Sequence, residues 1–140
     1  MTTAHALDRS DRPPARILYV EGDSYVSQVP SRFLVSCGYV VTVAHSAAEA
    51  WCHCKPGQDP FDVVIADGDT PAMGGIDLVT KLRSVRFPGR IIVFLASMDD
   101  GLVEGYEQLG VKGILKKPLE LSDLRECLEA IGAAEGGSRQ

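Results

Sequence analysis

The sequence of 140 residues has no apolar run approaching the roughly 20 residues that a helix needs to cross a bilayer. Its first 14 residues are polar and lack the apolar stretch of a secretory signal. Basic residues are also scarce, because 14 Lys and Arg against 19 Asp and Glu give a formal net charge of −5. Such a chain offers no basic stripe to nucleic acid and is not attracted to an anionic membrane. We therefore expect a cytoplasmic protein that binds neither.

Cysteine is too sparse for a disulfide framework, since only four occur in 140 residues. Two of them, Cys52 and Cys54, flank His53, and thiolates and imidazole are zinc ligands. Side chains two positions apart on a helix, however, point about 200° away from each other. The spacing therefore favours two ordinary helix cysteines over a shared metal ion.

The rest of the composition, 45% hydrophobic and 24% charged residues, is typical of one globular domain that is large enough to bury a core. We expect this domain over residues 15–132, between a disordered arm over 1–14 and a disordered tail over 133–140.

Five short, nearly continuous apolar runs predict strands that are buried on both faces. These strands are predicted over residues 16–20, 39–43, 61–66, 91–96 and 113–115. Helices are predicted over residues 24–37, 46–54, 75–85, 102–109 and 121–131. Ser24 is a candidate cap for the first helix, which Pro30 is expected to bend or break. Ser46 and Glu49 have the spacing of a capping box at the start of the second.

The alternation of strands and helices predicts an α/β fold, with helices on both faces of a parallel sheet. Ligands of such sheets bind outside the carboxyl ends of the strands. Glu21 and Asp23 follow the first predicted strand, Asp67 and Asp69 follow the third, and Lys117 follows the fifth. We therefore expect these charged side chains to lie close together.

Clustered carboxylates repel one another unless a cation relieves the repulsion. An oxygen-rich site with a lysine suits Mg²⁺ and a phosphoryl group. A carboxylate held in such a site can act as a nucleophile toward phosphorus, while the cations neutralise the charge on the transferred group.

The chain resembles the receiver domain of two-component response regulators over about residues 15–132. The matching segments are Ile17–Glu21, then Asp62–Asp67 followed by Pro71, Met73 and Gly75, and finally Lys117-Pro118. The resemblance implies a doubly wound, flavodoxin-like sheet of five parallel strands in the order 2-1-3-4-5.

The same resemblance implies that Asp67 is the phosphoacceptor and that Lys117 pairs with the phosphoryl group. It implies that Glu21, Asp67 and the backbone carbonyl of Asp69 hold Mg²⁺. The phosphoryl donor would be a histidine kinase or a phosphotransfer protein. The domain would be a signalling module, with at most self-catalysed phosphotransfer and dephosphorylation. The segments 102–109, 113–115 and 121–131 would form its usual surface for an effector or a second copy.

Three positions depart from the receiver pattern. Gly22 replaces the second of two adjacent acidic residues, and Asp23, one residue later, is expected to point elsewhere. Leu95 stands where receivers carry a Ser or Thr, and Ser97 would substitute for it only if the register slipped. Ile114 replaces the aromatic switch residue of the fifth strand. These departures predict weakened Mg²⁺ binding and a damaged readout of phosphorylation.

Two hypotheses follow from these departures. In the first, Asp69 swings into the pocket, replaces the missing carboxylate and keeps phosphotransfer active. In the second, the domain is a pseudo-receiver that binds a partner protein in its unmodified state.

An alternative is that the Asp67–Thr70 segment resembles the first motif of haloacid-dehalogenase-like phosphohydrolases. Asp67 would then be the nucleophile, Asp69 the general acid and Lys117 the phosphate-holding lysine. Against it, the motif follows the third strand instead of the first, and the sequence leaves no room for a cap domain. A flavin or nucleotide module is disfavoured because no glycine-rich loop follows the first strand.

Overall fold

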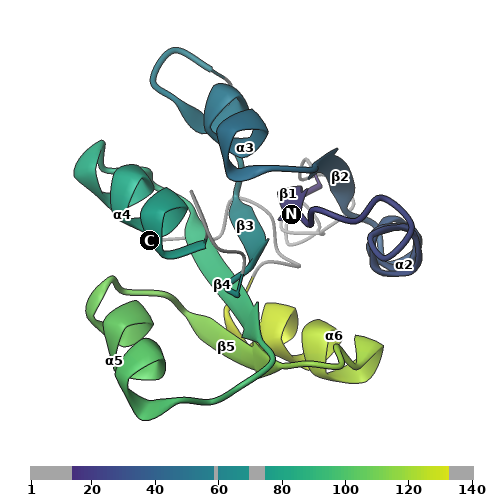
Figure 1. Cartoon of the computed structure of the whole chain (residues 1–140). Coiled ribbons are helices and arrows are strands. Elements are labelled where there is room, and N and C mark those ends of the chain that lie inside the picture. The colour runs from purple at the N-terminus through teal and green to yellow at the C-terminus, as the bar shows by residue number, and fades with distance from the viewer. Residues whose placement is uncertain (1–13, 59, 70–74, 133–140) are drawn as a thin grey trace, which may run out of the picture.

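The computed structural model describes residues 14–58, 60–69 and 75–132. Within them, a five-stranded parallel sheet has the strand order β2-β1-β3-β4-β5 (Figure 1). Its strands are β1 (Arg16–Val20), β2 (Val40–Ala44), β3 (Val63–Asp67), β4 (Arg90–Leu95) and β5 (Gly113–Lys116). The helices are α2 (Gln28–Ser36), α3 (Ala47–Cys54), α4 (Gly75–Ser84), α5 (Asp100–Gln108) and α6 (Leu121–Ala130). The predicted doubly wound α/β sheet and its strand order are confirmed, whereas the predicted arm and tail lie almost wholly outside the described residues.

The sheet separates two hydrophobic cores because successive side chains of a strand point to opposite faces. Ile17 and Tyr19 of β1 pack on the face that α2 and α6 cover, and Leu18 and Val20 pack on the face of α3, α4 and α5 (Figure 1). All four side chains are buried. This burial on both faces explains why the strands are apolar runs without alternation.

The start of the first helix differs from the prediction. The helix α2 begins at Gln28, because Asp23 Oδ1 accepts hydrogen bonds from the backbone N–H groups of Tyr25 (2.8 Å) and Val26 (3.1 Å) and so forms a turn. Ser24 is therefore not the cap. Pro30 falls in the first turn of the helix, where backbone donors have no partner within the helix, so it neither bends nor breaks α2.

At the next helix the predicted cap Ser46 is confirmed, while the side chain of Glu49 reaches back one residue further, to His45 instead of Ser46. Ser46 Oγ accepts from the backbone N–H of Glu49 at 3.0 Å, and Glu49 Oε1 accepts from the backbone N–H of His45 at 2.8 Å. These bonds fix the chain where it leaves the carboxyl end of β2. None of the helices in the described part of the chain has the length and hydropathy that a bilayer crossing requires.

The register of the strands brings the polar strand ends to one edge of the sheet. Asp67 pairs with Phe94, and Leu95 pairs with Lys116. The residues after β3, β4 and β5 therefore leave the sheet side by side.

Candidate functional site

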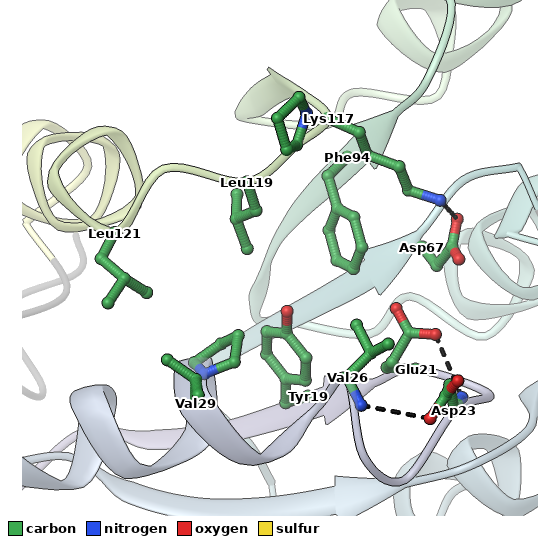
Figure 2. A pocket seen from close by; sticks show the side chains of 12 residues that line it. Tyr19, Glu21, Asp23, Val26, Val29, Asp67, Phe94, Lys117, Leu119 and Leu121 are labelled. Carbon is green, nitrogen blue, oxygen red and sulfur yellow. Dashed lines mark hydrogen bonds and ion pairs between the residues drawn. The ribbon is translucent and has the colours of Figure 1, made fainter.

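Asp67 is the last residue of β3, and its side chain is only 12% exposed. Its Oδ1 atom lies 2.9 Å from Lys117 Nζ and accepts a hydrogen bond from the backbone N–H of Asp69 at 2.9 Å (Figure 2). Both partners of this carboxylate thus contact the same oxygen. Oδ2 has no such partner among the described residues, so one carboxylate oxygen stays available to an incoming group.

Lys117 directly follows β5 and is held at the same edge of the sheet, because its backbone N–H donates to the carbonyl of Leu95 at the end of β4 at 2.8 Å. Its ammonium bridges two carboxylates, at 2.9 Å from Asp67 Oδ1 and 3.1 Å from Asp69 Oδ2. Partial burial lowers the pKa of Lys117, but the hydrogen bonds to the two aspartates outweigh it, so the pKa lies above its usual value. The ammonium therefore stays charged and relieves the repulsion between the carboxylates.

The side chain of Asp69 turns into the same site. Besides its contact with Lys117, its Oδ2 atom accepts a hydrogen bond from the backbone N–H of Ala96 at 2.6 Å. An ammonium and a backbone N–H at the end of a strand are both suited to hold an anion. In the described arrangement, the carboxylate of Asp69 takes both donors.

Glu21 lies at the end of β1 and is 8% exposed. Its Oε2 atom accepts from the backbone N–H of Asp23 at 3.1 Å, and its carbonyl lies 3.0 Å from Nδ1 of His45. Asp23 uses Oδ1 of its own carboxylate in the turn before α2, although it also lines the pocket beside Glu21 and Asp67. A side chain at Gly22 would meet little, because an added Cβ has its nearest neighbour, the carbonyl oxygen of His45, at 3.8 Å.

The described residues do not form a ready metal site. No group of three or more His, Cys, Asp and Glu side chains in this part of the chain is placed to hold an ion. Asp67 Oδ1 and Asp69 Oδ2 are paired with Lys117, and Glu21 Oε2 accepts from a backbone N–H, so Mg²⁺ would have to displace these contacts or bind through the remaining carboxylate oxygens. The roles of Glu21, Asp67 and Asp69 as metal ligands stay predictions.

A pocket of about 540 Å³ opens beside the acceptor between α2 and the segment that follows β5 (Figure 2). Tyr19 and Phe94 lie at its base, with ring centroids 5.8 Å apart, and Phe94 also lies 5.5 Å below the ammonium of Lys117. Val26 and Leu119 line its sides. The polar part of this largely apolar pocket is lined by Lys117 and by the acidic residues Glu21, Asp23 and Asp67.

The structure also shows where the departures from the receiver pattern lie. Leu95 ends β4 opposite Lys116 and is fully buried, so the register has not slipped. Ser97 lies two residues beyond the strand and is exposed, so it does not take the place of a hydroxyl at Leu95. Ile114 is partly buried and packs against the core beneath α3, α4 and α5.

Sequence reasoning missed Tyr106 of α5, which it placed only among the residues of a helix face. Tyr106 is fully buried, and its hydroxyl donates to the backbone carbonyl of Gly68 at 3.0 Å. Burial, together with the negative charges of Asp69, Asp67 and Asp77, raises the pKa of Tyr106 to about 12. The available signal was a glycine directly after the acceptor, which leaves space for a large side chain from elsewhere.

A known protein family matches most of the chain. The family model described as the response regulator receiver domain matches residues 17–129. The nitrate/nitrite response regulator protein NarL of Escherichia coli is 30% identical over 128 residues, which are 90% of this chain and 58% of that protein. The sensor histidine kinase AruS of Pseudomonas aeruginosa is 30% identical over 132 residues, 87% of this chain but 13% of that protein.

Solved structures agree with this match. A CheY-like response regulator receiver domain protein from Methanospirillum hungatei superposes with a TM-score of 0.78 at 23% identity, over 85% of this chain and 94% of that chain. The chemotaxis protein CheY4 of Vibrio cholerae superposes with a TM-score of 0.75 at 25% identity, over 85% and 99%. The chain thus spans less than two thirds of the length of either curated relative, 13% of AruS and 58% of NarL.

Proposed function

The chain belongs to the response-regulator receiver family, and on that premise we propose that Asp67 accepts a phosphoryl group from a histidine kinase or a phosphotransfer protein. One observation carries the proposal. The Oδ1 atom of Asp67 is held by Lys117 and by the backbone N–H of Asp69, while Oδ2 has no hydrogen bond or ion pair in the described part of the chain, and Asp67 lines the pocket. A nucleophile fixed through one oxygen presents the other in a defined direction.

In the proposed transfer, Asp67 Oδ2 forms a bond to phosphorus as the bond between phosphorus and the donor atom breaks. With a phosphohistidine donor, the leaving group is the imidazole nitrogen. The ammonium of Lys117 offsets the negative charge that gathers on the phosphoryl oxygens. Receiver domains generally bind Mg²⁺, but the carboxylates described here are engaged elsewhere, so no part of this account depends on the metal.

A second candidate function is binding of a partner protein by the unmodified domain. A specific observation favours it, because the carboxylate of Asp69 already takes the backbone N–H of Ala96 and the ammonium of Lys117. A phosphoryl group on Asp67 would need donors of this kind. The unmodified site therefore resembles one in which an anion is already bound, and a transferred phosphoryl group has to displace Asp69.

The test is the intact mass of the full chain after incubation with acetyl phosphate, with Mg²⁺ and with a chelator. The matched variants are Asp67→Asn and Asp69→Asn, which remove one carboxylate each from the same turn. Phosphotransfer predicts a gain of one phosphoryl group that is lost in Asp67→Asn and retained in Asp69→Asn. No gain under conditions that modify an ordinary receiver domain refutes phosphotransfer and leaves the unmodified binding module.

The phosphohydrolase alternative receives no support from the comparisons, and Asp67 lies at the end of the third strand. Receiver domains are signalling domains and generally not enzymes. Steady turnover of a generic phosphomonoester by this chain would revive the alternative.

The partner surface stays a proposal. The similarity to AruS and NarL, a sensor kinase and a response regulator by name, supports a phosphoryl donor of the two-component type. We propose α5, β5 and α6 as the face that meets an effector or a second copy of the chain. Size measurement before and after acetyl phosphate tests the second copy.

A further inference from the structure

The residue directly after the acceptor has no side chain, and the space beside it is filled from two other elements. A Cβ atom added to Gly68 would lie 2.6 Å from Cδ2 of Leu95 and 3.1 Å from Oη of Tyr106. Gly68, Leu95 and Tyr106 are therefore interlocked, since a side chain at the first position needs both others to move. All three lie on the α5 side of the acceptor strand.

Tyr106 adds a polar contact to this packing. Its hydroxyl donates to the carbonyl of Gly68 at 3.0 Å, while the backbone N–H of Gly68 donates to the carbonyl of Phe94 at 2.9 Å. The peptide groups on either side of Gly68 are thus held by β4 and by α5. A buried carbonyl that loses its hydrogen-bond donor raises the free energy of the folded chain, so the positions of Gly68 and Tyr106 depend on each other.

Of the two side chains that lie nearest to Gly68 in the described part of the chain, only that of Tyr106 can donate a hydrogen bond. Leu95 is aliphatic and fully buried, and Ile114 packs against the same core. The helix that carries Tyr106 is tied just beyond its last turn, in which Tyr106 itself lies, because Arg83 Nε donates to the carbonyl of Leu109 at 2.7 Å and its Nη2 to that of Gly110 at 3.0 Å. A shift at Gly68 therefore acts on a helix that is anchored beyond its last turn.

We propose that Tyr106 is a positioning residue that holds the acceptor turn through Gly68 and passes the modification state of Asp67 to α5. The coupling rests on the proposed phosphorylation of Asp67, whereas the holding of the turn does not. A phosphoryl group on Asp67 draws Lys117 and the backbone N–H of Ala96 away from Asp69, so the turn over residues 67–69 rearranges. The hydrogen bond between the Gly68 carbonyl and the Tyr106 hydroxyl then differs between the unmodified and the phosphorylated turn. This difference in free energy shifts the position of α5.

The first test removes one oxygen atom. Tyr106→Phe keeps the ring, and Tyr39→Phe is the matched control, because Tyr39 is buried in the core on the opposite face of the sheet. Hydrogen exchange of the Asp69 amide, which belongs to the same peptide group as the Gly68 carbonyl, is measured in the unmodified full chain. Exchange is expected to accelerate by roughly 2- to 10-fold in Tyr106→Phe, the ratio for one net hydrogen bond, and to stay unchanged in Tyr39→Phe. Equal exchange in both variants overturns the holding role.

The second test follows backbone amide resonances of α5, such as those of Gly101 and Gly105, before and after acetyl phosphate. Tyr106→Phe is expected to gain the phosphoryl group by mass, while the shifts in α5 fall to less than half of those in the unsubstituted chain and in Tyr39→Phe. Full shifts in a phosphorylated Tyr106→Phe chain overturn the coupling. If the unsubstituted chain gains no mass, the phosphorylation proposal and the coupling both fail, and the exchange measurement alone decides the holding role.

Discussion

Substituting Gly68 with alanine tests the interlocked packing directly. The backbone of Gly68 has no positive φ, so alanine adopts it without strain, and the penalty comes from the 2.6 Å approach of the new methyl group to Leu95 Cδ2. Inserting a methyl group into a packed core costs about 1–3 kcal/mol of the free energy of unfolding. We expect Gly68→Ala to fall in this range. Gly22→Ala is the matched control, since its Cβ meets nothing closer than 3.8 Å.

The origin of that cost is found by combining Gly68→Ala with Leu95→Ala. The single Leu95→Ala change leaves a cavity in the core and should destabilise by about 2–5 kcal/mol. In the double variant the methyl group introduced at position 68 enters the space that the leucine leaves, so the severe contact disappears and only the 3.1 Å contact with Tyr106 Oη has to relax, by a few tenths of an ångström. The double variant should therefore be no less stable than Leu95→Ala alone, which makes the two changes non-additive by about 1–3 kcal/mol.

Urea unfolding of the four chains, followed by circular dichroism, gives this coupling energy from the midpoints at a constant slope. Leu34→Ala on the opposite face of the sheet is the additive control, since Leu34 belongs to the other core. Additivity of Gly68→Ala and Leu95→Ala within about 0.5 kcal/mol would show that the two positions do not compete for one space, and the reasoning would be wrong.

Three further predictions concern the site. Gly22→Asp restores a carboxylate where the structure has room, so isothermal titration should detect Mg²⁺ binding tighter than that of the unsubstituted chain; equal affinity contradicts the steric argument. Asp69→Asn removes the negative charge that competes for Lys117, so mass spectrometry should record faster phosphorylation by acetyl phosphate; a slower gain would assign Asp69 a supporting role. The pKa of Tyr106 is raised to about 12 in the folded chain and lies near 10 in the unfolded chain, so the free energy of unfolding should fall as the pH rises between these values. The fall should be less steep in Tyr106→Phe. Urea unfolding that gives both chains the same pH dependence would contradict this.

The sheet was predictable because each strand carries its signal locally. Residues 16–20 were predicted as a strand with the bounds that the structure has, and the other strands and most helix ends fall within about two residues. The first helix was the exception. Its start at Gln28 depends on Asp23, which caps a turn before the helix, and on Pro30, which fits into the first helical turn. An acidic residue and a proline at these positions are equally compatible with a helix that begins at residue 24, so the sequence alone did not distinguish the two starts.

The convergence of Asp67, Asp69 and Lys117 was predictable for a different reason. Parallel strands all end at one edge of the sheet, so residues that follow different strands meet without any knowledge of side-chain contacts. The direction of each side chain was not predictable in this way. Whether Asp69 faces a metal or the backbone N–H of Ala96 depends on the local turn, and the structure gives the latter.

The role of Tyr106 could not be predicted from its own sequence neighbourhood, because it depends on the missing side chain of a residue far away in the chain. A tyrosine in an amphipathic helix is ordinarily a core residue, and only the missing side chain of Gly68, 38 residues earlier, gives its hydroxyl a backbone carbonyl to reach. Leu95 fits for the same reason, since its Cδ2 atom lies only 2.6 Å from where the Cβ of any other residue at position 68 would be. The loss of a hydroxyl at Leu95 is thus not an isolated defect. Together with Gly68 and Tyr106, Leu95 forms one packed arrangement, and that arrangement places a different hydroxyl, from a helix, against the turn that carries the acceptor.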